Sequence, residues 1–296
     1  MMKKLMTLLL AASFLILLSS CATGLEPYDA KKPLGEQINY TITGIDAGGG
    51  IMSATDKAIE DYKLTNWQLQ PSSSAAMTST LEKAIKDKRP IVVTGWTPHW
   101  MFTKYDLKFL KDPKESFGTA ESIHTIVRQG LKKDEPSAYT VLDRFHWTPE
   151  EMSDVMLDVN NGMDPEKAAE KWIKANPDAV AEWTKGVSKV DNRKLKLTYV
   201  AWDSEIASTN VVALVLNQLG YDTTIQAMEI QPMWASVATD AADGMVAAWL
   251  PRTSGAFYKD YKDKVDDLGP NLEGAQLGLV VPTYMENINS IEDLKK

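Results

Sequence analysis

The order of apolar and polar segments along the chain predicts the same α/β unit twice. In the first half, apolar runs predict strands and the segments between them predict helices: strands at 42–46, 67–70 and 91–96, helices at 51–62 and 73–86. After residue 195 the order returns: strands at 195–202, 223–227 and 245–249, helices at 205–219 and 232–239. Gly220 stands where a glycine commonly ends a helix. Each half is therefore expected to be a βαβαβ unit with helices between parallel strands.

Between the two units, three segments begin with residues typical of helix starts. Thr148, Asp164 and Asn176 are each followed by a proline and then by an acidic residue, as expected for an N-cap and a first helical turn. The sequence therefore predicts a helical region here. Together these elements indicate an α/β fold with two lobes, each a mostly parallel sheet flanked by helices, that closes like a clamshell on a small molecule.

Three of the predicted strands end in a small residue followed by tryptophan: Trp96, Trp202 and Trp249. In open α/β sheets, ligands bind outside the carboxyl ends of the strands. Three indoles brought to such a place would form an aromatic box, which suits a quaternary ammonium ion through cation–π attraction. The alternative is that these tryptophans belong to the core, because tryptophan is often buried.

A second candidate element is the glycine run Gly48–Gly50, which lies between the first predicted strand and its helix. Such a turn directs free backbone N–H groups and the positive end of a helix at one point, where an anion can bind. No Gly-Lys-Ser/Thr follows, so the run is not a Walker loop; tight packing is the alternative role. With the three tryptophans, this turn suggests a ligand with a quaternary ammonium head and a carboxylate, in other words a betaine.

The N-terminus predicts export. Lys3 and Lys4 precede an apolar run at 5–18 that is too short to span a bilayer, and small residues follow it, as in a secretory signal peptide over residues 1–20. Cys21 is the only cysteine, and its place at the expected cleavage point indicates a bacterial lipoprotein. The alternative is a leftover cysteine after an ordinary signal peptide. We therefore expect a lipid-anchored tether over residues 21–36 and a protein on the outer face of the cytoplasmic membrane.

Charge and histidine content exclude several other function classes. The formal net charge of −8 argues against nucleic acid or an anionic membrane surface as partner. The three histidines have no metal-ligand spacing and no Gly-x-Ser-x-Gly is present, so we expect no metal, no cofactor and no catalytic residues. His99 is expected to be a packed or solvent-facing turn residue, and the alternative is that it touches the site, because it is close to Trp96 in sequence. Asp203 and Glu205 are expected to stabilise the N-terminal turn of a helix electrostatically, with one of them helping to orient an indole.

Several longer runs resemble one known family: 48–52, 94–101, 199–208, 248–251, 278–282 and 289–296. They are similar to the glycine betaine-binding lipoproteins of Opu-type ABC importers, and the resemblance covers essentially the whole chain. It implies a type II periplasmic-binding-protein fold, which we divide into lobe one (37–125 plus 283–296) and lobe two (126–282). It also implies a solute-binding protein, not an enzyme, that delivers its solute to a membrane permease powered by a separate ATPase.

The resemblance also implies roles for particular residues. Trp96, Trp202 and Trp249 would surround the trimethylammonium group, and the backbone N–H groups of Gly50 and Ile51 would bind the carboxylate. The family has a histidine where this chain has Ser254. Serine has a shorter reach and carries no charge.

The serine leaves the choice of ligand open. Glycine betaine could bind more weakly or through a water, or the ligand could be choline, carnitine or a sulfonium analogue. A secreted enzyme acting on trimethylammonium compounds is the alternative from another class.

Overall fold

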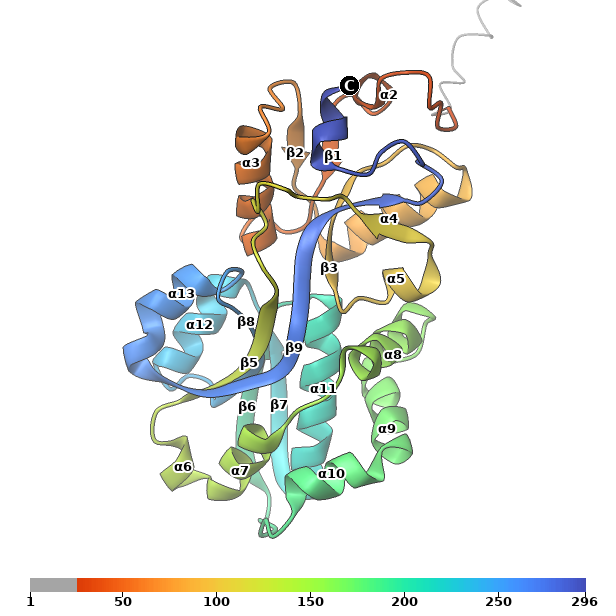
Figure 1. The fold of residues 1–296 in the computed structure, drawn as a ribbon. Helices are drawn as coiled ribbons and strands as arrows, with labels where there is room; N and C mark the ends of the chain where they lie inside the picture. The colour runs from red at the N-terminus through yellow and green to blue at the C-terminus, as the bar shows by residue number, and fades with distance from the viewer. Residues whose placement is uncertain (1–25) are drawn as a thin grey trace, which may run out of the picture.

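The computed structural model describes residues 26–296 and shows two lobes, one above the other in Figure 1. The predicted signal peptide and Cys21 lie outside the described residues. Across 26–296, none of the helices combines the length and the apolar character that crossing a membrane requires.

The upper lobe contains the first predicted unit. Strand β1 (Thr41–Thr43) pairs in parallel with β2 (Gln68–Gln70) and with β3 (Val93–Thr97). The connecting helices are α3 (Gly50–Asp61) and α4 (Ser74–Lys86), so the predicted βαβαβ order is confirmed. Three short elements complete this part of the chain: α2 (Leu34–Gln37), α5 (Met101–Lys104) and β4 (Leu107–Phe109).

The lower lobe repeats this arrangement, as predicted. Strand β6 (Arg193–Tyr199) pairs in parallel with β7 (Tyr221–Ala227) and with β8 (Gly244–Leu250), and the helices between them are α11 (Asp203–Gln218) and α12 (Ile230–Ala238). Gly220 has φ +96°, and a Cβ there would lie 2.0 Å from the Val190 carbonyl oxygen, so glycine is required at this turn.

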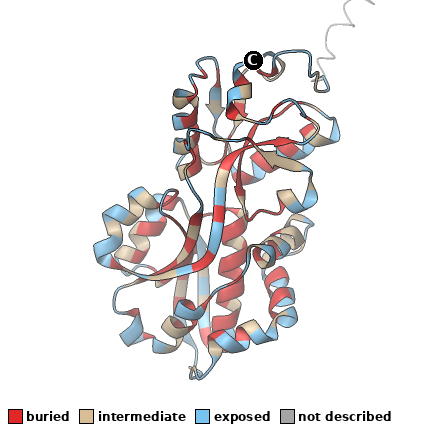
Figure 2. Ribbon diagram, viewed as in Figure 1, coloured by how far each residue is buried: buried red, intermediate tan, exposed pale blue. Residues whose placement is uncertain are grey.

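The predicted helical region is also present in the lower lobe. Its helices are α6 (Leu131–Asp134), α7 (Pro136–Arg144), α8 (Pro149–Asn160), α9 (Pro165–Ala175) and α10 (Pro177–Thr184). Thr148 and Glu151 form a capping box at the start of α8, and Asp164 caps α9. Helix α11 packs between the sheet and helices α8 and α9, which explains why most of its residues are buried (Figure 2).

One long strand, β9 (Val265–Pro282), belongs to both lobes (Figure 1). Its first part pairs antiparallel with β5 (Glu121–Arg128), and its last part pairs antiparallel with β3 and β4. The sheet order is β2-β1-β3-β9-β5-β8-β6-β7, with β4 beside β9. Each lobe is thus parallel in its βαβαβ unit and antiparallel where β9 joins, and the predicted two-lobed α/β class is confirmed. The remaining elements are α13 (Gly255–Tyr261) and two 3-10 turns, Lys262–Lys264 and Ile291–Lys295.

Part of the segment assigned to the tether packs against the upper lobe. The Tyr28 amide donates to the Lys88 carbonyl at 2.8 Å, and the Tyr28 hydroxyl donates to Asn287. Leu34 is only 2% exposed. The mixed polar sequence of this segment, with Pro27 and Pro33, suggested a tether between lipid and fold, but Leu34 belongs to the core and Tyr28 packs against it.

Candidate functional site

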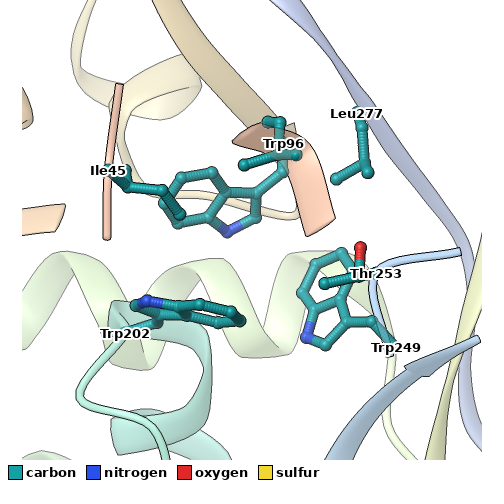
Figure 3. A pocket seen from close by; sticks show the side chains of 7 residues that line it. Ile45, Trp96, Trp202, Trp249, Thr253 and Leu277 are labelled. Carbon is teal, nitrogen blue, oxygen red and sulfur yellow. The ribbon is translucent and has the colours of Figure 1, made fainter. Parts of the chain in front are cut away.

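An apolar pocket lies where the two lobes meet. The three predicted tryptophans line it together with four other residues: Ile45, Ile51, Thr253 and Leu277. Figure 3 shows the indoles of Trp96, Trp202 and Trp249 surrounding a common space, with Thr253 and Leu277 at one side. The structure therefore brings together, in one pocket, aromatic rings that lie up to 153 residues apart in sequence.

Different elements position the three indoles. Trp96 lies in β3 opposite Leu277 of β9, and Trp249 lies in β8 opposite Ile123 of β5. The third, Trp202, is not at a strand end as predicted, because β6 stops at Tyr199 and Trp202 is the N-cap residue of α11. One indole thus comes from the upper lobe and two from the lower.

Trp202 also makes a hydrogen bond across the cleft. Its indole Nε1 donates to Asp46 Oδ2 at 3.1 Å, and Asp46 follows β1 in the upper lobe. The bond fixes the orientation of the ring that forms the floor of the pocket in Figure 3. Sequence analysis missed Asp46 as a partner, although its position two residues before the glycine run places it at the mouth of the sheet.

Asp203 forms a second set of contacts between the lobes. Its carboxylate accepts a hydrogen bond from Ser74 Oγ at 2.8 Å and one from Trp100 Nε1 at 2.9 Å, and it lies 3.6 Å from His99 Nε2. Burial alone would raise the pKa of Asp203, but the contacts from His99, Ser74 and Trp100 outweigh it and lower the pKa to about 2. Asp203 is therefore a charged acceptor for two upper-lobe donors, with His99 close beside it. The indole that it orients is Trp100, which is not one of the pocket tryptophans.

Glu205 behaves differently, although it is only two residues away. It is 1% exposed, and its Oε2 accepts a hydrogen bond from the Val200 amide at 2.6 Å. Burial raises the pKa of Glu205 to about 8, more than the Val200 amide lowers it, so the side chain is mainly protonated at pH 7. The predicted position in the first turn of α11 is confirmed, but the electrostatic role is wrong for Glu205, because a neutral acid gains little from the helix dipole.

This buried acid predicts a specific dependence of stability on pH. The native state holds a proton on Glu205 between about pH 4.5 and pH 8 that the unfolded state releases, so its contribution to the free energy of unfolding falls as pH rises through that range. Glu205→Gln keeps an acceptor for Val200 without the titration. We expect urea unfolding at pH 5, 6, 7 and 8 to show a shallower decline for Glu205→Gln than for the parent. Parallel declines would contradict the assignment.

The glycine run forms the turn before α3, as predicted. Gly49 is the N-cap residue, and the amides of Gly50 and Ile51 donate to no acceptor among residues 26–296. A Cβ on Gly50 would lie 2.4 Å from Thr253 Cα. Glycine is therefore needed here because the backbones of the two lobes touch, and the unpaired amides stand beside the pocket wall formed by Ile51.

The loop after Trp249 supplies Thr253 to the pocket and continues with Ser254. Ser254 is 1% exposed, and its amide donates to the Trp249 carbonyl at 2.8 Å, but it does not line the pocket. Glu121 binds the same loop through the amides of Arg252 and Thr253. Sequence analysis missed Glu121, because its partners are 131 and 132 residues away.

His99 is packed, as one of the two predicted alternatives states. It is 1% exposed, and its ring meets Trp96 edge-on with centroids 4.6 Å apart. His99 thus supports Trp96 from outside the pocket. Within the part of the chain that the structure covers, no three His, Cys, Asp or Glu side chains lie together in a way that would hold a metal ion.

Comparisons with known proteins agree with the resemblance seen in the sequence. Residues 25–175 and 193–296 match the family model OpuAC, the substrate-binding domain of ABC-type glycine betaine transport systems. The glycine betaine/carnitine transport binding protein GbuC of Listeria monocytogenes serotype 1/2a (strain 10403S) is 74% identical over 100% of this chain and 99% of its own length.

Two solved structures match over about half of the chain. Lactococcal OpuAC, in its closed-liganded conformation complexed with glycine betaine, is 51% identical over 55% of this chain and 64% of its own, with a TM-score of 0.49. The glycine betaine, L-proline-binding protein ProX of Borrelia burgdorferi is 34% identical over 55% of this chain and 63% of its own, with a TM-score of 0.48. The assignment rests on the family model and the full-length relative: this chain belongs to the OpuAC family of substrate-binding domains of ABC-type glycine betaine transport systems, a family of transport proteins and not of enzymes.

Proposed function

We propose that this protein captures glycine betaine, or a closely related quaternary ammonium compound, in the pocket between its lobes. The observation that carries the proposal is the convergence of Trp96, Trp202 and Trp249 on one apolar space. A quaternary ammonium ion has no N–H to donate and a small desolvation cost, so indole faces suit it better than hydrogen-bond acceptors do. Each ring contributes about 0.5–2 kcal/mol to such a cation, depending on its desolvation.

The carboxylate end is assigned to the start of α3. The Gly50 and Ile51 amides are free to donate, and they stand at the positive end of a helix of 12 residues. Ile51 and Thr253 both line the pocket, so a zwitterion with its cation among the indoles would have the start of α3 beside it. Ser254, which does not line the pocket, stays a predicted carboxylate contact.

The chain's place in transport follows from its family and its N-terminus. We assign it to the outer face of the cytoplasmic membrane, anchored by a lipid on Cys21, from where it delivers solute to an ABC permease driven by a separate ATPase. The named relative from Listeria handles glycine betaine and carnitine, which supports carnitine as a second ligand.

Calorimetric titration with glycine betaine, carnitine, choline and proline tests this proposal. Glycine betaine should bind most tightly and carnitine should bind measurably, whereas proline, without a quaternary nitrogen, should bind least. Absence of heat with every quaternary compound would contradict the proposed function. Turnover of any of them by the purified protein would favour the enzyme alternative.

Ser254→His tests the anion end of the pocket. The longer side chain adds a donor near the carboxylate, and a hydrogen bond to a charged group is worth about 1.5–3 kcal/mol, which corresponds to about tenfold or more. We expect Ser254→His to tighten glycine betaine more than choline, which has no carboxylate, and the gain should grow from about pH 8 to pH 6 as the histidine becomes charged. Equal improvement for both ligands would show that position 254 does not face the carboxylate.

A further inference from the structure

The loop that follows Trp249 is held in place by one buried carboxylate. Glu121 is 3% exposed and begins β5. Its Oε1 accepts hydrogen bonds from the amides of Arg252 and Thr253 at 2.6 and 2.9 Å, and its Oε2 accepts one from Thr253 Oγ1 at 2.7 Å. No cation is paired with this carboxylate among residues 26–296. Two successive N–H groups and a hydroxyl therefore stabilise the buried charge.

These bonds decide how Thr253 faces the pocket. Its hydroxyl is committed to Glu121, and in Figure 3 the hydroxyl oxygen points away from the indoles. Thr253 also lies against the start of α3, since its Cα would be 2.4 Å from a Cβ on Gly50. The end of the pocket assigned to the ligand carboxylate is thus bounded by two backbone segments, one from each lobe. The turn of α3 is fixed by its own helix, and the loop is fixed by Glu121.

Glu121 also stands at a crossing between the lobes. The chain leaves the upper lobe after β4 and enters the lower lobe at β5, where Glu121 pairs with Ala275 of β9. In the crossing segment, Gly118 lies so close to the Arg252 side chain that a Cβ on it would be 1.7 Å from the guanidinium carbon. The loop is therefore attached to the crossing segment at two points, through Glu121 and through Arg252.

From this arrangement we infer that Glu121 is a positioning residue for recognition of the ligand carboxylate: it sets loop 251–254 against the amides of Gly50 and Ile51 without touching the ligand. The inference rests on the proposed function, because it assumes a ligand whose cation lies among the indoles. It assigns a specificity role to a residue that stands outside the pocket lining.

The test compares two substitutions of similar size. Glu121→Gln keeps an oxygen that can accept from the two amides. Glu121→Asp keeps the charge, but its side chain is one methylene shorter, so the carboxylate lies farther from the loop. The exposed Glu273, opposite Ser122 on β9, serves as control through Glu273→Ala. Calorimetry measures the affinity for glycine betaine and for tetramethylammonium, which has no carboxylate, and thermal unfolding without ligand checks that each variant is folded.

We expect Glu121→Asp to lower the affinity for glycine betaine at least about tenfold and the affinity for tetramethylammonium by less than about threefold. The affinity of Glu121→Gln for glycine betaine should remain near that of the parent. Equal weakening of both ligands, unchanged glycine betaine binding, or a loss in Glu121→Gln as large as in Glu121→Asp would overturn the inference. A parent protein that binds no quaternary ligand would overturn the proposed function instead. The two failures are therefore distinguishable.

Discussion

Trp202→Ala is expected to weaken glycine betaine binding by about tenfold or more, the largest loss among the pocket substitutions. The indole contributes its face to the cation, and its Nε1 makes the hydrogen bond to Asp46 across the cleft. Loss of one ring removes about 0.5–2 kcal/mol of cation–π attraction and opens the pocket to water. Trp96→Ala and Trp249→Ala should each weaken binding by at least roughly tenfold, about 1.4 kcal/mol. Calorimetry measures all three.

Phenylalanine substitutions separate the ring from its N–H group. Trp202→Phe keeps an aromatic face but loses the donor to Asp46, so its loss should be smaller than that of Trp202→Ala. Trp183→Phe is the matched control, because Trp183 is fully buried in the helical region of the lower lobe, stacked on Trp172. Wild-type affinity in all three alanine variants would place the cation elsewhere.

Asp203→Ala is expected to speed ligand release and to lower glycine betaine affinity at least about tenfold. The substitution leaves the donors of Ser74 and Trp100 without their acceptor when the lobes close, and hydrogen bonds to a charged group are worth about 1.5–3 kcal/mol each. Ligand binding should therefore shift the lobes toward closure less effectively. Stopped-flow tryptophan fluorescence gives the release rate, and small-angle scattering gives the radius of gyration with and without ligand.

Asp178→Ala is the control for the helix-end contribution. Asp178 is an exposed acid in the first turn of α10, as Asp203 is an acid in the first turn of α11, but it makes no contact across the cleft. Only Asp203→Ala should change the rate of ligand release. The radius of gyration of the parent should decrease at saturating ligand. An unchanged scattering profile of the parent, or equal release rates in both variants, would contradict a closure role for Asp203.

Local sequence patterns predicted much of the fold because they act over short distances. The apolar runs ending at Trp96 and Trp249 are strands, and the helix starts at Thr148 and Asp164 are capped as expected. The expectation that the three indoles lie together rested on a general rule about strand ends in α/β sheets, although Trp202 lies beyond the end of β6, at the start of α11. These features need only residues that are neighbours in the chain.

Contacts between distant residues were not predictable in this way. Asp203 was expected to stabilise its own helix, and one of Asp203 and Glu205 to help orient an indole, but nothing in the sequence indicated that the partners of Asp203, Ser74 and Trp100, lie in the other lobe. Glu205 was expected to be charged, but the packing around α11 buries it and raises its pKa. Likewise, the sequence around Gly269 and Gly274 did not predict a continuous strand, although β9 runs through both residues.

The shared strand β9 constrains the order in which the protein can fold during synthesis. Residues 276–282 pair with β3 and β4 of the upper lobe, but they are made after the entire lower lobe. The upper lobe therefore keeps an unfilled gap in its sheet until the ribosome has nearly finished, whereas β1 and its parallel neighbours are made early. Long-range pairings of this kind slow folding and expose strand edges meanwhile. The last part of the chain thus completes the first lobe, and both lobes become native together.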